Sequence, residues 1–214
     1  MPMPPTSDTK PPAYWNKARR HLKASDAVMA ALIRDSRAAA LRPRDDPFFS
    51  LARSIVGQQI SVKAAESVWG KLEDAAGDVT PDNLTDLGAE RLRACGVTRM
   101  KAGYLISLSG HFRDGSLDVA SWTKLDDEAV IDQLTQVKGI GRWTAEMFLI
   151  FYLLRPDVLP VGDVGVQRAI GNHYNGGERP DAAAMRRIAE PWRPWRSVAV
   201  WYLWRSLDAV PVDY

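Results

Sequence analysis

The chain has 214 residues, which is long enough for one compact body or two small lobes around a sizeable core. Hydrophobic residues make up 46% and charged residues 25%, an ordinary balance for a soluble globular protein, and no apolar run is long enough to span a membrane. The single cysteine excludes an internal disulfide and a cysteine-ligated metal cluster, and the three histidines lack metal-ligand spacing, so we expect no metal or cofactor. The net charge of +2 decides little. Residues 138–205 contain ten Lys or Arg and six Asp or Glu. This excess of positive charge fits a solvated helical surface about as well as a surface that binds DNA phosphates.

The pattern along the chain predicts helices nearly throughout. Residues 1–13 are rich in proline and contain no apolar stretch, which predicts a disordered tail rather than a signal peptide. From there on, apolar residues recur at three-to-four spacing with little β-branched alternation, so we predict an all-α fold. Capping residues mark five predicted helix starts, at Asp46, Ser61, Thr80, Thr98 and Asp126. Gly57 and Gly77 are expected to end the first two of these helices.

The stretch LTQVKGIGRWTAEMFLIFYLL contains two glycines, Gly139 and Gly141, between two helical patterns. This spacing is typical of a helix–hairpin–helix, in which glycines let the backbone approach a phosphate and the amides of the second helix point at it. Lys138 and Arg142 would add positive charge. Such a hairpin supplies affinity and register without sequence specificity. The alternative is a tight turn between two packed helices.

Asp163 lies in the next informative segment, LPVGDVGVQRAI, where Pro160 and Gly162 interrupt the helical pattern. The carboxylate is therefore predicted at the start of a helix. It could serve only as an N-cap, or it could also stabilise positive charge that develops on a substrate. The two interpretations are compatible, because the positive end of a helix favours an ionised carboxylate.

Four motifs in order carry a family resemblance: IVGQQIS, GIGRWTA, the GD of the following loop, and PWRPWRSVAVWYLW. Together they resemble the helix–hairpin–helix (HhH-GPD) DNA glycosylase superfamily over residues 45–208, and within it the 3-methyladenine DNA glycosylase II type in a compact form without an N-terminal β-rich domain. The resemblance implies a bilobal helical body over residues 14–214, with the active-site cleft between the lobes. Residues 14–50 and 157–214 would form one lobe, and residues 51–156, with the hairpin at 134–147, the other.

The resemblance also implies roles for individual residues. Asp163 matches the catalytic aspartate and Gln59 the wedge that fills the gap left by a flipped nucleotide. The base pocket would include Trp143, Met147 and Trp204. Phosphate would be held by backbone amides at Gly139, Gly141 and Thr144. No metal is firmly expected, although the family hairpin often binds a monovalent cation, here through the carbonyls of Thr135, Val137 and Gly139.

The implied activity is base excision repair. The enzyme would flip an alkylated purine, such as 3-methyladenine or 7-methylguanine, out of double-stranded DNA and hydrolyse its N-glycosidic bond. A methylated purine carries positive charge, so it leaves readily and attracts an aromatic face, and a single carboxylate suffices. Trp143 stands where strand-nicking relatives have a lysine, so we expect hydrolysis without lyase activity. We expect no cofactor, no protein partner, a monomer, and a location in the cytoplasm of a bacterium or the nucleus of a eukaryote.

Two other functions fit the same residues less well. One is a non-catalytic DNA-damage binding module that uses the hairpin, and the other is a glycosylase for oxidised or deaminated bases. Tryptophans outside the implied pocket are expected to pack in the core, since aromatic residues at helical spacing usually do so. These are Trp192, Trp195 and Trp201.

Overall fold

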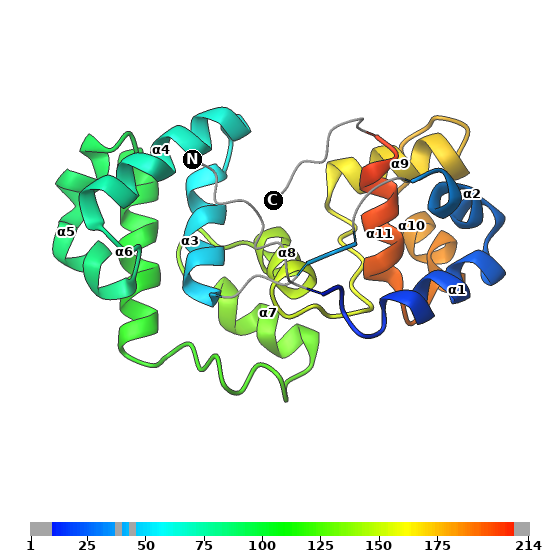
Figure 1. Ribbon diagram of the computed structural model, residues 1–214, viewed down its shortest axis with the longest axis horizontal. Helices are drawn as coiled ribbons and strands as arrows, with labels where there is room; N and C mark the ends of the chain where they lie inside the picture. Colours follow the sequence, from blue (N-terminus) through cyan, green and yellow to red (C-terminus); the bar gives the residue numbers. More distant parts are fainter. Residues whose placement is uncertain (1–9, 37–39, 43–45, 208–214) are drawn as a thin grey trace. The chain divides into compact units, whose positions relative to one another are not determined.

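The computed structural model describes residues 10–36, 40–42 and 46–207, and within these ranges the chain is all-α, as predicted (Figure 1). The helices, in chain order, are α1 (Trp15–Ser25), α2 (Ala27–Asp35), α3 (Pro47–Gly57), α4 (Val62–Ala76), α5 (Pro81–Ala94), α6 (Arg99–Arg113), α7 (Asp127–Thr135), α8 (Arg142–Phe151), α9 (Val164–Tyr174), α10 (Ala182–Ile188), the 3₁₀ turn η1 (Glu190–Trp192) and α11 (Arg196–Arg205). The tail predicted over residues 1–13 lies mostly outside the described residues.

The five predicted helix starts are confirmed by their caps. In each case the side-chain oxygen of the capping residue accepts a hydrogen bond from the backbone N–H three residues later, which satisfies a donor that the helix itself cannot pair. Helix α3 ends at Gly57, and α4 ends just before Gly77, whose φ of 70° suits glycine. Two further caps, Asp26 on α2 and Asp181 on α10, were not predicted.

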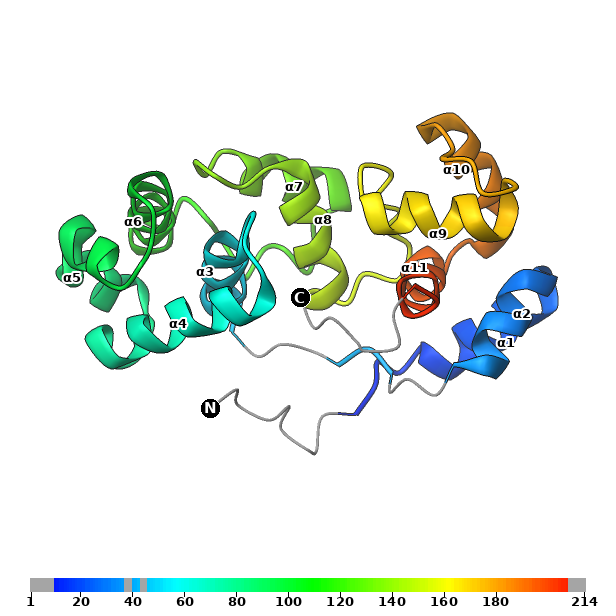
Figure 2. The same ribbon diagram turned by 90° about the horizontal axis from the view of Figure 1, so that it is seen from above.

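The described helices belong to two compact units, which divide within α8 between Phe148 and Leu149. The first unit contains α3 to α7 and α8 as far as Phe148. Helix α6 packs against α5 and α3, which lie beside it in both views (Figures 1 and 2). The core of this unit is mostly apolar, and the buried Trp122 ring meets Phe148 edge to face with the centroids 5.2 Å apart.

The second unit joins segments that are far apart in the sequence. Helices α1 and α2 pack against α11, and α9 lies along α11 (Figures 1 and 2). The three tryptophans expected in the core pack here. Trp192 and Trp201 are buried, whereas Trp195 is half-buried and stacks on Tyr14 with ring centroids 5.5 Å apart.

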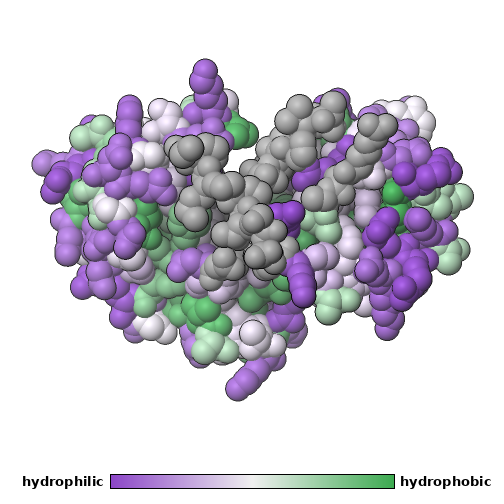
Figure 3. All heavy atoms as spheres, in the orientation of Figure 1, coloured by the Kyte–Doolittle hydropathy of each residue, from purple (hydrophilic) through white to green (hydrophobic). Residues whose placement is uncertain are grey.

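Hydrophilic side chains cover most of the outer surface in the face shown in Figure 3, with small apolar patches between them. This is the usual surface of a globular protein, because apolar side chains gain free energy by leaving water. Among the described residues, no helix combines the length and the apolar character that crossing a membrane requires.

Asp26 joins three elements of the second unit through one carboxylate. Its Oδ1 accepts the backbone N–H of Met29 at 2.9 Å, which caps α2. Its Oδ2 accepts the hydroxyl of Tyr174 at 3.0 Å and the indole N–H of Trp192 at 2.8 Å. Burial, together with the adjacent Asp26 charge, raises the pKa of the Tyr174 hydroxyl above its ordinary value. Asp26 therefore ties α2 to the end of α9 and to η1.

Replacing Asp26 by alanine should lower the free energy of unfolding by about 2–4 kcal/mol, because a cap is lost and two donors, the buried Trp192 and the half-buried Tyr174, lose their acceptor. Urea unfolding followed by circular dichroism measures this loss. Asp181→Ala is the matched control, since Asp181 is exposed and only caps α10; it should cost about 1 kcal/mol. Equal losses in the two variants would contradict a linking role for Asp26.

Candidate functional site

Asp163 is the N-cap of α9 and is buried, with 6% of its surface exposed. Its Oδ1 accepts the backbone N–H of Val166 at 2.7 Å and the indole N–H of Trp204 at 2.9 Å. The two donors come from α9 and from α11, so the carboxylate is fixed by a helix start and by an aromatic side chain of another helix. Capping and a chemical role are therefore compatible here, as the sequence indicated.

An aromatic cluster adjoins this carboxylate. The Trp204 ring stacks on Phe151 with centroids 5.7 Å apart and planes 17° apart, and Trp201 meets the edge of Phe151 at 6.4 Å. Gly165 makes room for the contact between Trp204 and Asp163, because a Cβ at this position would lie 3.1 Å from Asp163 Oδ1 and 3.2 Å from Trp204 Cδ1. The cluster gives Asp163 an electron-rich, largely apolar border.

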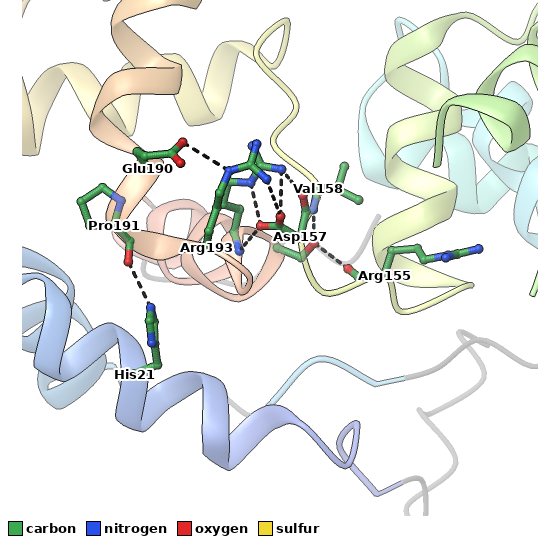
Figure 4. A network of polar contacts seen from close by, with 9 residues as sticks. His21, Arg155, Asp157, Val158, Glu190, Pro191 and Arg193 are labelled. Carbon is green, nitrogen blue, oxygen red and sulfur yellow. Dashed lines mark hydrogen bonds and ion pairs between the residues drawn. The ribbon is translucent and has the colours of Figure 1, made fainter. Parts of the chain in front are cut away.

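The loop that leads to Asp163 is tied to the first turn of α11 (Figure 4). The Arg196 guanidinium donates to both carboxylate oxygens of Asp157, at 2.7 and 3.0 Å, and Arg193 donates to the same carboxylate at 3.1 Å. The Ser197 hydroxyl donates to the carbonyl of Arg155 at 2.6 Å and accepts the N–H of Val158 at 2.9 Å. Helix α11 therefore holds this loop with its N-terminal turn and the Asp163 carboxylate with Trp204 near its C-terminus.

The hairpin lies between α7 and α8 in the first unit. Gly139 has a φ of 89°, and a Cβ there would lie 2.2 Å from the Tyr104 ring, so only glycine fits. Gly141 and Lys138 are exposed. The carbonyl of Gly141 accepts a hydrogen bond from the N–H of Ala145 in the first turn of α8, at 3.1 Å. The following amides, including that of Thr144, belong to the first turn of α8, where N–H groups have no acceptor within the helix. This geometry suits an anion.

Arg142 is engaged by two carboxylates. It donates to both oxygens of Glu128 on α7, at 2.9 and 2.5 Å, and to Glu146 on α8 at 3.2 Å. The hydrogen bonds from Arg142 lower the pKa of the Glu128 carboxyl. The guanidinium thus clamps the two helices of the hairpin together while 56% of the Arg142 side chain stays exposed, and Lys138 is exposed as well.

The remaining predicted residues fall into different environments. Gln59 is exposed in the turn between α3 and α4. On α8, Trp143 is 38% exposed whereas Met147 is buried. In the second unit the structure brings Asp163 and Trp204 into contact. In the first unit it links the Gln59 turn to the hairpin, because the side-chain amide of Gln58 donates to the Gly139 carbonyl at 2.8 Å.

Two of the three carbonyl oxygens predicted to hold a monovalent cation accept hydrogen bonds within the protein. The Gly139 carbonyl accepts from Gln58, and the Val137 carbonyl accepts the N–H of Ile140 at 3.0 Å. Their lone pairs are therefore partly used. The cation stays a prediction, and no step of the reaction proposed below is tied to it.

Sequence reasoning missed Gln58, Tyr104 and Phe151 in these arrangements. It also missed Lys101 on α6, whose ammonium donates to the carbonyls of Val56 and Gln58. One of them carried a signal, since Lys101 lies at the apolar register of α6, four residues before the buried Leu105. For the other three, only the folded structure shows which neighbour each side chain meets.

The fold is that of a DNA-repair protein family. Residues 52–194 match the model of the HhH-GPD superfamily base excision DNA repair proteins, and the chain belongs to this family. It is 30% identical over 197 residues to DNA-3-methyladenine glycosylase 1 of Schizosaccharomyces pombe, covering 89% of this chain and 86% of that protein. The predicted family is confirmed.

Two solved structures show the same fold. A DNA-3-methyladenine glycosidase from Bacillus halodurans superimposes with a TM-score of 0.81 at 36% identity, covering 90% of this chain and 89% of that one. A 3-methyladenine DNA glycosylase from S. pombe in complex with abasic DNA gives a TM-score of 0.77 at 32% identity, covering 90% and 98%.

Replacing Gly139 by alanine should lower the free energy of unfolding by about 2–4 kcal/mol, because the new Cβ meets Tyr104 in a left-handed backbone conformation. It should also weaken binding to undamaged duplex DNA. Gly141→Ala is the matched control, since a Cβ there meets nothing within 4 Å, and it should cost less than about 1 kcal/mol. Chemical unfolding and fluorescence anisotropy measure the two effects. Equal behaviour of the two variants would refute the requirement for glycine at 139.

Proposed function

We propose that this protein is a DNA-3-methyladenine glycosylase, which removes alkylated purines from double-stranded DNA by hydrolysis and has no lyase activity. The observation that carries the proposal is the buried Asp163 carboxylate, held by Val166 and Trp204 beside an aromatic cluster. The relatives named DNA-3-methyladenine glycosylase support it, since they match nearly the whole chain. The abasic DNA bound by one of them is the product of such a reaction.

The proposed chemistry breaks the bond between C1′ of the deoxyribose and the ring nitrogen of the purine. The bonding electron pair leaves with the base, so a purine that was positively charged through methylation departs neutral. The sugar is left with oxocarbenium character, which the Asp163 carboxylate stabilises. Water adds to C1′ and loses a proton, which completes the hydrolysis and leaves an abasic site.

The aromatic cluster favours alkylated purines over oxidised or deaminated ones. A methylpurine cation is attracted to the electron-rich face of a tryptophan, whereas a neutral lesion lacks this attraction. Trp204 supplies such a ring directly next to Asp163. Trp143, which is partly exposed, is proposed as a second pocket residue.

Two features of the first unit are proposed to hold the DNA. The hairpin amides after Gly139, with Lys138, would bind a backbone phosphate, and the exposed Gln59 would fill the space of the flipped nucleotide. Neither feature reads base sequence, so the enzyme would survey DNA without a sequence preference. We propose that it does so as a monomer.

Asp163→Asn should reduce the release of methylated bases from methylated duplex DNA by about a hundredfold or more, the loss typical of removing one charge-stabilising group from a transition state. Chromatography identifies the freed bases. Asp181→Asn is the control, because Asp181 is an equivalent N-cap on α10 with no proposed contact to substrate. Binding to abasic DNA should persist in both variants.

The outcomes separate the competing functions. If the wild-type protein binds damaged DNA and frees no base, it is a binding module. If it frees oxidised or deaminated bases and no methylpurine, the proposed lesion class is wrong. Cleavage of the strand after base release would contradict simple hydrolysis.

Trp204→Phe tests the contact to Asp163. Phenylalanine preserves an aromatic ring opposite Phe151 and removes the N–H that donates to Asp163 at 2.9 Å. Because a hydrogen bond to a charged group contributes about 1.5–3 kcal/mol, single-turnover base release should slow about tenfold to a hundredfold. An unchanged rate in a folded variant would show that this hydrogen bond does not orient the carboxylate.

A further inference from the structure

The turn that contains Gln59 is held by residues that lie outside the turn. Gln59 has a φ of 58°, a left-handed conformation that a residue with a side chain adopts at a cost and keeps only where its surroundings impose it. The backbone hydrogen bonds of the turn are long, at 3.4 Å from Gln58 N–H to the Ile55 carbonyl and 3.5 Å from Ile60 N–H to the Gly57 carbonyl. They are too weak to hold the turn alone.

Lys101 supplies the missing contacts. Its ammonium donates to the carbonyl of Val56 at 2.8 Å and to that of Gln58 at 2.5 Å. These oxygens lie at the C-terminal end of α3, where carbonyls lack partners within the helix and the helix dipole attracts a cation. The ammonium therefore closes the end of α3 and holds the residue directly before Gln59.

Burying the ammonium of Lys101 costs free energy, which some other interaction has to offset. Its side chain is buried, with 8% of the residue exposed, and among the described residues it forms no ion pair with a carboxylate. Burial lowers the pKa of this ammonium, because the charged form is desolvated. An apolar side chain at this register of α6 would avoid that cost. The lysine is best explained by the turn that it holds.

Gln58 connects the same turn to the hairpin. Its side-chain N–H donates to the Gly139 carbonyl at 2.8 Å, and Gly139 itself lies directly under the Tyr104 ring of α6. Helix α6 thus contacts both features, the turn through Lys101 and the hairpin through Tyr104, one helical turn apart. The residue proposed to enter the DNA and the loop proposed to bind a phosphate belong to one hydrogen-bonded arrangement.

We propose that Lys101 and Gln58 are positioning residues, which hold the Gln59 turn at a fixed distance from the phosphate-binding hairpin. Binding of the DNA backbone at the hairpin and insertion of Gln59 into the space of the flipped nucleotide then occur together. This inference rests on the proposed function. Neither residue needs to touch the reacting atoms. Their loss should impair insertion at the lesion more than it impairs binding to ordinary duplex.

The test compares Lys101→Met, Gln58→Met and the double variant, which keep side-chain length and remove the donors. The DNA carries a stable abasic-site analogue with 2-aminopurine as the neighbouring base, whose fluorescence rises when insertion disturbs stacking. Each single variant should lose most of this rise. Single-turnover release of methylpurines should slow about tenfold, the effect of losing a hydrogen bond to a well-placed group. Affinity for undamaged duplex should change less than about twofold, and Lys71→Met, at an exposed position of α4, should behave as wild type.

The double variant separates coupling from general damage. If both residues hold one turn, their reductions of the single-turnover rate of base release should not multiply in the double variant, because either single variant already releases the turn. Reductions that multiply, or a wild-type fluorescence rise in folded single variants, would overturn the proposal, as would a parallel fall in affinity for undamaged DNA. Should Lys101→Met fail to fold, Gln58→Met decides alone, since Gln58 is half-buried and uncharged. If the wild type gives the fluorescence rise but frees no methylpurine, the proposed function fails while the positioning role is still tested.

Discussion

The interaction on which the proposed chemistry depends is the double hydrogen bond to Oδ1 of Asp163. One donor is the start of α9 and the other is the Trp204 indole of α11, so the carboxylate position is set by two helices rather than by its own rotamer preference. A negative charge held in this way needs little reorganisation when positive charge develops next to it, which is the main source of electrostatic catalysis. The contacts between the start of α11 and the loop before Asp163 extend the same constraint.

The structure separates tasks between different kinds of groups. Backbone amides and one exposed lysine at the hairpin are suited to a phosphate that every nucleotide carries, whereas the aromatic cluster beside Asp163 is suited to a charged base. Arg142 also has a structural task. Its guanidinium holds α7 against α8 through Glu128 and Glu146, so its charge supports the shape of the hairpin, and its contact to a phosphate stays a prediction.

Much of the fold could be predicted from local pattern. The caps at Asp46, Ser61 and Asp126 act within three residues of themselves, so their effect is visible in the sequence. The same is true of the glycines in the hairpin. Gln58 and Tyr104 could not be assigned in this way, because each acts on Gly139, which lies 81 residues further along the chain in one case and 35 in the other.

The sequence by itself therefore determined the all-α class, the helix starts, the hairpin and the presence of a carboxylate at the start of α9, since all of these depend on short-range hydrogen bonding and periodicity. The tertiary structure decided which side chains surround that carboxylate and which hold the Gln59 turn. Trp204, Phe151 and Lys101 reach their partners only after helices distant in sequence have packed, and the packing of apolar faces, rather than any local propensity, brings them there.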